Sequence, residues 1–284
     1  MISRPTSLSP RIPFVLAAIV VVPIACVGAD PDLGVSAAPD LDGSVADGTH
    51  DGGAADGPSR QAVEAGFDES GAATIPVHVV RNPSAPGHPA YGASVDVKDL
   101  VVTGRKSAGS THGFFAQDAT SRPWGGVYAF VGYAPVGVVP GDVVRVRGVY
   151  KAYRGFDQIE VWNGGSVTVT GHQNVPEPLP VSVADVAQGG ARARALQSMR
   201  LVVSNVTTTV ATNGIDFRVV ASGTTAPELA ITSYVANDTG ASPFPSTAGQ
   251  TWALIRGFGY ESGASDDVTV AKLAPQSSDD LVGP

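Results

Sequence analysis

The chain has 284 residues, including 34 glycines and 22 prolines, and its formal net charge at pH 7 is −8. A chain so rich in glycine, proline, valine and threonine excludes a protein built from long helices and is typical of an all-β fold. The negative charge is concentrated near the N-terminus, because residues 28–70 hold ten acidic residues and one basic residue, whereas residues 73–284 hold 16 and 15. We therefore expect a nearly neutral folded part that follows an acidic segment.

Residues 1–26 are typical of an export signal. Arg4 and Arg11 precede an apolar run at 12–25, which is short for a membrane-spanning helix and has the length of a signal-peptide core. The run ends in the sequence PIAC, which is similar to a bacterial lipobox although Pro23 departs from the usual aliphatic residue. One interpretation makes Cys26, the only cysteine, the lipidated first residue of an envelope lipoprotein. The alternative is cleavage after Ala29, which would release a secreted protein.

Residues 27–72 are predicted to be a disordered tether. They are rich in glycine, alanine and aspartate, show no apolar period and contain a single aromatic residue. Such a segment cannot bury enough apolar surface to offset the entropy lost on ordering. We expect a folded module that is held at the envelope by a flexible tether and that contacts the membrane only through a lipid anchor.

The first folded unit is predicted at residues 73–172. The alternation of its first long strand changes phase near Leu100, as a bulged strand would. Five or so short strands in about 100 residues are the size of an OB-like barrel. The expected strands lie at 93–104, 113–118, 125–133, 142–150 and 155–170.

A second unit is predicted at residues 181–284. It follows residues 173–180, where three prolines favour a stiff, extended connector. A helical turn is expected at 192–197. The expected strands lie at 199–210, 215–221, 228–234, 250–260 and 266–273.

The two units contain a repeated pattern. Residues 141–161 and 249–270 share a leading glycine, an apolar run, an Arg-Gly pair, an aromatic residue, a turn and a final short strand. Their separation is that of a domain duplication, because the units of a solenoid are much shorter. We therefore predict two tandem OB-like five-stranded β-barrels, with immunoglobulin-like sandwiches as the alternative.

Four motifs are similar to those of OB-fold-type domains in bacterial extracellular nucleases and related exported lipoproteins: GFFAQD, GGVYAFVG, PGDVVRVRGVYKAYRGFDQIE and KLAPQSSDDL. The resemblance covers most of residues 74–284 and consists mainly of strand and turn patterns. It implies a barrel fold and an association with nucleic acid. Such nucleases also carry an endonuclease/exonuclease/phosphatase domain with metal-binding acids and a catalytic histidine pair. That domain has no counterpart in this sequence, so the resemblance implies no active site.

The sequence contains no local motif for catalysis or for a cofactor. The chain has five histidines, none at metal-ligand spacing from another: His50, His78, His88, His112 and His172. Nucleophile-elbow, phosphate-loop and dinucleotide-binding motifs do not occur either. We expect no metal, no cofactor and no catalytic residue. An enzyme whose site is assembled from distant loops is the open alternative.

Strand alternation in the first unit indicates which side chains leave the core. Tyr128 and Phe130 are expected to point outward from their strand, as are Arg145 and Arg147 from theirs. The residues that alternate with them are expected to face the core: Val127, Ala129, Val131, Val144 and Val146. The first unit is also the basic one, because residues 73–172 hold nine basic and six acidic residues and residues 173–284 hold six and ten.

Exposed aromatic rings beside arginine and lysine are typical of a groove that binds single-stranded nucleic acid. The candidate ligand-binding residues are Tyr128, Phe130, Arg145, Arg147, Lys151 and Arg154. In the structural alternative, the two rings pack under the loop at 107–113 and the arginines only keep the sheet soluble. Trp124 and Trp162 would equally serve a sugar-binding face.

These features predict an exported, non-catalytic binding module, anchored in the bacterial cell envelope or secreted. Its OB-like barrels are expected to bind a protein or a polymeric ligand. The alternative function is the binding of single-stranded DNA at the cell surface through the first barrel.

Overall fold

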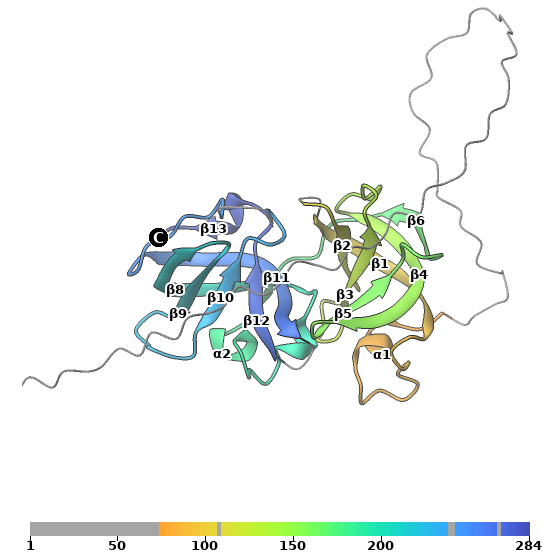
Figure 1. Ribbon diagram of the computed structural model, residues 1–284, viewed down its shortest axis with the longest axis horizontal. Helices are drawn as coiled ribbons and strands as arrows, with labels where there is room; N and C mark the ends of the chain where they lie inside the picture. The colour runs from red at the N-terminus through yellow and green to blue at the C-terminus, as the bar shows by residue number, and fades with distance from the viewer. Residues whose placement is uncertain (1–73, 107–108, 238–241, 266–267) are drawn as a thin grey trace, which may run out of the picture. The chain divides into compact units, whose positions relative to one another are not determined.

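A computed structural model of the protein describes residues 74–106, 109–237, 242–265 and 268–284 (Figure 1). These residues belong to one compact unit of the chain, residues 56–284. About half of them form strands, joined by two short α-helices, α1 (Val77–Arg81) and α2 (Val183–Val186), and two 3-10 turns, η1 (Arg194–Leu196) and η2 (Ser278–Asp280). The predicted export signal with Cys26 and nearly all of the predicted tether lie outside the described residues.

The first sheet is a closed five-stranded barrel with one added strand. The strands pair in the order β1-β2-β3-β5-β4, and β4 pairs back onto β1. Within this sheet only β3 and β5 pair in parallel, and β6 pairs with the first half of β4, residues 142–147. The strands are β1 (Ser94–Lys106), β2 (His112–Gln117), β3 (Gly126–Gly132), β4 (Asp142–Tyr153), β5 (Phe156–Glu160) and β6 (Ser166–His172). The predicted all-β fold with an OB-like barrel is confirmed, and this unit is not a sandwich of two separate sheets.

Strand β1 closes the barrel because it is long enough to pair with two neighbours. Its first part pairs with β4 and its last part with β2. The pairing with β4 shifts register between Val97 and Leu100, and Asp99 has a φ of 59° there. This irregularity is the predicted change of phase, and it lets one strand bend around the barrel.

The second sheet repeats the pairings of the first. Its strands pair in the order β8-β9-β10-β12-β11, with β11 also paired to β8 and with β10 parallel to β12. Edge strands β7 and β13 add to β8 and β11. The strands are β7 (Leu179–Pro180), β8 (Arg200–Asn213), β9 (Asp216–Ala221), β10 (Leu229–Thr232), β11 (Thr251–Ser265), β12 (Val268–Ala274) and β13 (Leu281–Val282). The repeated sequences therefore correspond to β4–β5 and β11–β12, which hold equivalent places in the two pairing orders.

The end of the predicted connector differs from the prediction. Leu179 and Pro180 form β7, which pairs in parallel with Leu201 and Val202 of β8. Proline is tolerated there because an edge strand needs hydrogen bonds on one side only. Part of the connector is thus a strand of the second sheet and not a free spacer.

Each sheet encloses its own apolar core. The first core contains Val127, Ala129, Val144 and Val146, as the alternation predicts, and Val131 packs against it half-buried. Helix α1 contributes Val77 and Val80 to this core. The second core receives Val183 and Val186 from α2 in the same way. A short helix thus contributes to each core, α1 ahead of β1 and α2 ahead of β8 in the chain.

Gly148 of β4 is required by close packing. A Cβ added there would lie 2.3 Å from the backbone oxygen of Glu160 and 2.7 Å from Ile159 Cγ2 on β5. We expect Gly148→Ala to lower the free energy of unfolding by about 1–3 kcal/mol, because strand β5 must move. Gly137, which has open space around its Cα, is the matched control, and Gly137→Ala should change stability little. Urea denaturation measures both, and equal effects of the two substitutions would contradict the packing argument.

Candidate ligand-binding cleft

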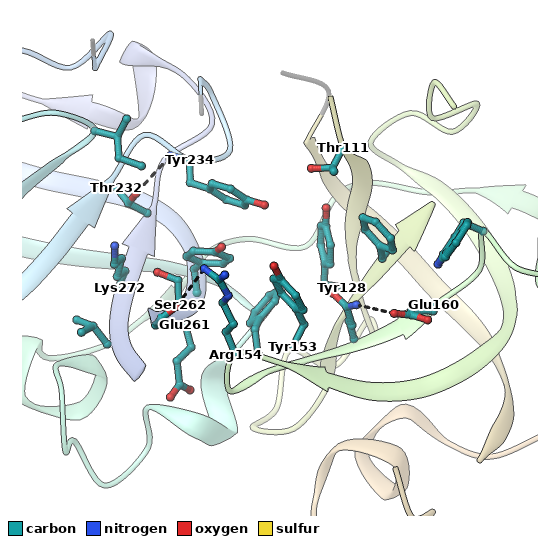
Figure 2. Close-up of a pocket in the computed structure, with 18 of the residues that line it drawn as sticks. Thr111, Tyr128, Tyr153, Arg154, Glu160, Thr232, Tyr234, Glu261, Ser262 and Lys272 are labelled. Carbon is teal, nitrogen blue, oxygen red and sulfur yellow. Dashed lines mark hydrogen bonds between the residues drawn. The ribbon is translucent and has the colours of Figure 1, made fainter. Parts of the chain in front are cut away.

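A cleft of about 650 Å³ lies between the first and the second sheet (Figure 2). It is lined from the first sheet by residues of β3 and β5 and by the turn after β4, and from the second by residues of β10, β11 and β12. Its volume is within the range of small-molecule sites, about 300–1,000 Å³. Eight aromatic side chains line it: Tyr128, Phe130, Tyr133, Tyr153, Phe156, Trp162, Tyr234 and Tyr260.

The backbone explains why these rings gather in one place. Tyr128 and Phe130 alternate on β3 with core residues, and Phe156, Gln158 and Glu160 do the same on β5, its parallel neighbour. The two strands thus present the same outward face to the cleft. The tight turn at Arg154 and Gly155, where both residues have positive φ, reverses the chain directly after Tyr153 and places Tyr153 and Arg154 at the cleft.

Aromatic rings from both sheets form the floor of the cleft. Phe115 of β2 stacks on Phe258 of β11 with ring centroids 4.2 Å apart and an interplanar angle of 6°. Phe156 meets the edge of Tyr260 at 4.9 Å, and Tyr260 stacks on Tyr234 at 4.8 Å. Together with Tyr128 these rings form a third apolar cluster, separate from the cores of the two sheets.

The rim of the cleft is aromatic and exposed. Tyr133 is 70% exposed, Tyr153 60% and Trp162 53%. The rings of Tyr133 and Trp162 meet edge to face, with centroids 6.4 Å apart. Large exposed aromatic side chains that surround a cavity are typical of binding sites.

The charged groups of the lining are balanced. Two are basic, Arg154 and Lys272, and two are acidic, Glu160 and Glu261. Glu160 accepts a hydrogen bond of 2.6 Å from Lys151, and Lys272 donates one of 2.6 Å to Asp216. Side-chain hydroxyl and amide groups complete the polar part of the lining: Thr111, Tyr128, Tyr133, Tyr153, Gln158, Thr232, Tyr234, Tyr260 and Ser262. The cleft is therefore uncharged overall and rich in hydrogen-bonding groups.

The hydroxyl of Tyr260 at the floor stays protonated. Burial raises the pKa of Tyr260 well above its usual value of 10, and the neighbouring Tyr234 raises it further. Nearby, the ammonium group of Lys106 lies 4.7 Å from the centroid of the Tyr234 ring and donates to the Thr111 carbonyl oxygen at 2.8 Å. The hydroxyl of Tyr260 thus remains a neutral donor and acceptor at physiological pH.

The structure separates the predicted site residues into two places. Phe130 and Arg154 line the cleft, Tyr128 lies at its floor, and Lys151 is paired with Glu160 at its edge. The prediction that Tyr128 is an exposed ring is wrong, because it is only 5% exposed. The second sheet covers it through the cluster that contains Phe258.

Arg145 and Arg147 do not line the cleft. Both hydrogen-bond to Asp96 of β1, with Nε distances of 2.7 Å and 3.0 Å, and Arg145 adds a second bond to the same carboxylate. The predicted common face with Tyr128 and Phe130 is therefore wrong. These arginines lie where β4 pairs with β1 and β6, whereas only the end of β4 pairs with β5, the neighbour of β3.

The Asp96 pair has a consequence for stability at low pH. Burial raises the pKa of Asp96, but hydrogen bonds from Arg145 and Arg147 outweigh burial and hold the pKa below its usual 3.8. Because the pKa of Asp96 is lower in the folded state, its ionised form stabilises that state, in full at pH values above the unfolded-state pKa of about 3.9. This contribution disappears as the pH falls through the folded-state pKa. We expect Asp96→Asn to destabilise the protein at neutral pH and progressively less below pH of about 4. Urea denaturation across this range measures the difference, and a pH-independent difference would contradict the assignment.

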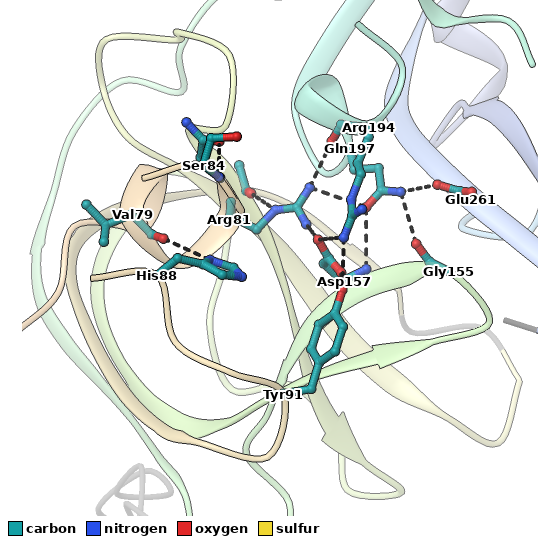
Figure 3. A network of polar contacts seen from close by, with 12 residues as sticks. Val79, Arg81, Ser84, His88, Tyr91, Gly155, Asp157, Arg194, Gln197 and Glu261 are labelled. Carbon is teal, nitrogen blue, oxygen red and sulfur yellow. Dashed lines mark hydrogen bonds and ion pairs between the residues drawn. The ribbon is translucent and has the colours of Figure 1, made fainter. Parts of the chain in front are cut away.

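A buried polar network joins the first sheet to the segment that leads into the second (Figure 3). Arg81 of α1 forms an ion pair with Asp157 of β5, and both side chains are buried. Arg81 also donates to the Gln197 side chain at 3.3 Å and to the Arg194 carbonyl oxygen at 3.2 Å. Gln197 in turn donates to the Gly155 carbonyl oxygen at 3.1 Å and to the cleft residue Glu261. The network therefore connects elements on both sides of the cleft.

The sequence prediction missed most of the rim and all of the second wall. Trp162 was noted for a sugar-binding face and lines the cleft, but Trp124 does not, and its backbone N–H donates to the Ala195 carbonyl oxygen at 2.7 Å. Tyr133 and Trp162 follow the last residues of β3 and β5, where strand alternation no longer applies. Tyr234 and Tyr260 belong to the second sheet, and no local feature of the sequence indicates that this sheet packs against the first.

Two further observations concern other kinds of site. Within residues 74–284, apart from the stretches that are not described, no group of three or more His, Cys, Asp or Glu residues could hold a metal ion. In the same part of the chain, no helix has the length and apolar character needed to cross a membrane. Comparison of the chain with protein-family models and with curated proteins finds no match.

Proposed function

We propose that this protein is an exported, non-catalytic binding module that takes its ligand in the aromatic cleft. The observation that carries the proposal is the exposed aromatic rim, Tyr133, Tyr153 and Trp162, above a floor of packed rings. Exposing such large apolar side chains around a cavity costs free energy that a bound ligand would recover by covering them. The two carboxylates of the lining accept hydrogen bonds from Lys151 and Gln197.

The architecture around the cleft supports a duplicated module. We infer that the second sheet is an OB-like barrel as well, because its strand pairings match those of the first barrel. The similarity to OB-fold-type domains of bacterial extracellular nucleases and exported lipoproteins is part of the same proposal. Lipid attachment at Cys26, followed by a flexible tether, would present the module at the envelope.

The anchor has a direct test. Cells that produce the full chain are labelled with an alkyne fatty acid, and the wild type is compared with Cys26→Ser. Label on the wild type alone, together with recovery in the membrane fraction, supports the anchor. Unlabelled wild-type protein in the medium would indicate cleavage after Ala29 instead.

The binding function is tested with probes of three classes: a 20-residue oligothymidylate, a neutral oligosaccharide set and a set of disordered peptides. We expect at least one class to bind the full chain and to lose about tenfold or more in affinity with Trp162→Ala, roughly 1.4 kcal/mol. Val169→Ala, which removes exposed apolar surface from β6 outside the cleft, is the control and should bind as the wild type does. Equal binding by Trp162→Ala, or no binding by any class, would refute the proposal.

Single-stranded DNA remains the second candidate ligand, because the cleft combines stacking surfaces with Arg154 and Lys272. Such binding must weaken steeply with salt, since cations on the protein replace counterions along the phosphates. Affinity for the oligothymidylate that does not change between low and high salt would exclude this candidate.

A further inference from the structure

We propose that the ligand of the aromatic cleft is a neutral carbohydrate chain whose sugar rings stack on Trp162, Tyr133 and Tyr153. The inference rests on the proposed binding function and specifies the chemical class of the ligand. Three features of the cleft carry it: the balance of its charges, the pairing of its strands, and the combination of flat rings with planar polar groups.

The charge balance disfavours a polyanion. The cleft lining carries two basic and two acidic side chains, and Lys272 is already paired with Asp216. Arg145 and Arg147, the strongest candidates for phosphate contacts, are occupied by Asp96 away from the cleft. A nucleic acid or an acidic polysaccharide needs an excess of cations along its path. A neutral ligand meets no such requirement.

The strand pairing disfavours an extended peptide. Peptides commonly bind a sheet by adding a strand to a free edge. Of the strands that line the cleft, β3, β5 and β10 are each already paired on both sides. β3 lies between β2 and β5, and β10 lies between β9 and β12. The wall formed by β3 and β5 therefore offers no free edge to a peptide, and recognition there must come from side chains.

The exposed rings match the apolar face of a pyranose sugar. The C–H bonds on that face carry partial positive charge and are attracted to the electron-rich face of an aromatic ring. Trp162 and Tyr133 meet edge to face on one part of the rim, and Tyr153 stands on the turn after β4. Figure 2 shows Tyr128 and Tyr153 on one wall and Tyr234 on the other. Rings on two walls can cover both faces of a sugar.

The polar groups of the cleft match sugar hydroxyls. Carboxylates accept several hydrogen bonds, guanidinium and amide groups donate them from a plane, and tyrosine hydroxyls both donate and accept. The lining offers all of these in Glu160, Arg154, Gln158 and Tyr260. These groups have partners within the protein, but a carboxylate, a guanidinium and an amide keep further donor or acceptor sites that adjacent hydroxyls on a sugar ring can satisfy.

Affinity gel electrophoresis of the full chain tests the inference. Separate native gels contain soluble neutral polysaccharides (hydroxyethylcellulose, arabinoxylan and galactomannan), an acidic polysaccharide (polygalacturonate), or no additive. We expect at least one neutral polymer to retard the wild type. The apparent affinity for that polymer should fall at least tenfold with Trp162→Ala and with Tyr133→Ala. Val169→Ala should migrate as the wild type does. Glu160→Gln keeps the shape of the side chain and should weaken binding severalfold, because the amide accepts fewer hydrogen bonds than the carboxylate.

The outcomes separate this inference from the function on which it rests. Binding of a neutral polymer that depends on Trp162 supports both. Binding of oligothymidylate, polygalacturonate or peptide that depends on Trp162, without binding of a neutral polymer, overturns the carbohydrate assignment and leaves the cleft as a binding site. Absence of any cleft-dependent binding overturns both. Circular dichroism and urea midpoints of each variant establish that it is folded before its binding is compared.

Discussion

Replacing Arg81 by methionine is expected to lower the free energy of unfolding by about 3–5 kcal/mol, because the substitution leaves a buried carboxylate without its ionic partner. Arg81 and Asp157 are both fully buried. The guanidinium also donates to the Gly126 carbonyl oxygen at 3.0 Å, and that acceptor would lose its side-chain partner as well. Desolvated groups that lose their partners account for most of the expected loss.

Two companion variants make the Arg81 result interpretable. Arg122→Met removes a comparable pair with Asp118, but Arg122 is half-exposed, so its loss should amount to about 0.2–1 kcal/mol. The double variant Arg81→Met with Asp157→Leu removes both charges and should recover much of the stability lost by Arg81→Met alone. Urea denaturation, fitted with one m-value for all proteins, gives the difference in the free energy of unfolding between the wild type and each of the three variants. A loss below about 1 kcal/mol for Arg81→Met would contradict the view that this pair is a buried ionic contact.

Replacing Phe258 by alanine is expected to cost about 3–5 kcal/mol and also to uncouple the two sheets. Phe258 is 2% exposed, and it stacks on Phe115 of the first sheet. Removing the ring leaves a cavity in the apolar cluster that the two sheets share. The wild type should unfold in one transition, and the variant in two, because each sheet keeps its own core.

The control for Phe258→Ala is Phe217→Ala. Phe217 is equally buried but belongs to the core of the second sheet alone. Its loss should therefore destabilise the second sheet by a similar amount. Hydrogen–deuterium exchange that resolves β3 from β9 is the decisive measurement. Phe258→Ala should accelerate exchange in both strands and weaken binding in the cleft, whereas Phe217→Ala should accelerate it mainly in β9. Accelerated exchange that is confined to β9 in both variants would show that the shared cluster contributes little to the coupling of the two sheets.

The strands could be predicted from the sequence because their signal is local. Alternation along β3 and β4 identified the core residues Val127 and Val144, and the phase change near Leu100 identified the irregularity in β1. Glycine and proline marked the turns, so that even the short strand β10 was predicted close to its observed bounds. Alternation also predicted correctly that Tyr128 leaves the barrel core.

The site was only partly predictable, since alternation specifies a face of a strand but not what covers that face. The bonds of Arg145 and Arg147 to Asp96 depend on the register of β1 against β4, which opposes Asp96 to Arg147. Tyr128 is buried in a cluster that also contains Phe258, which belongs to the other sheet. Nothing in the residues next to Tyr128 or Arg147 carries that information.

The sequence by itself determined the all-β class, the positions of most strands along the chain, the repeated strand pair and the core face of β3 and β4, because hydrophobic alternation and turn residues act over a few positions. Only the tertiary structure decided that Tyr128, Phe156, Tyr234 and Tyr260 form one cleft and that Arg145 and Arg147 stay outside it. The physical reason is the closure of the barrel together with the packing of two sheets. Both bring residues from distant parts of the chain into contact, and that contact determines which outward-facing side chains become a site.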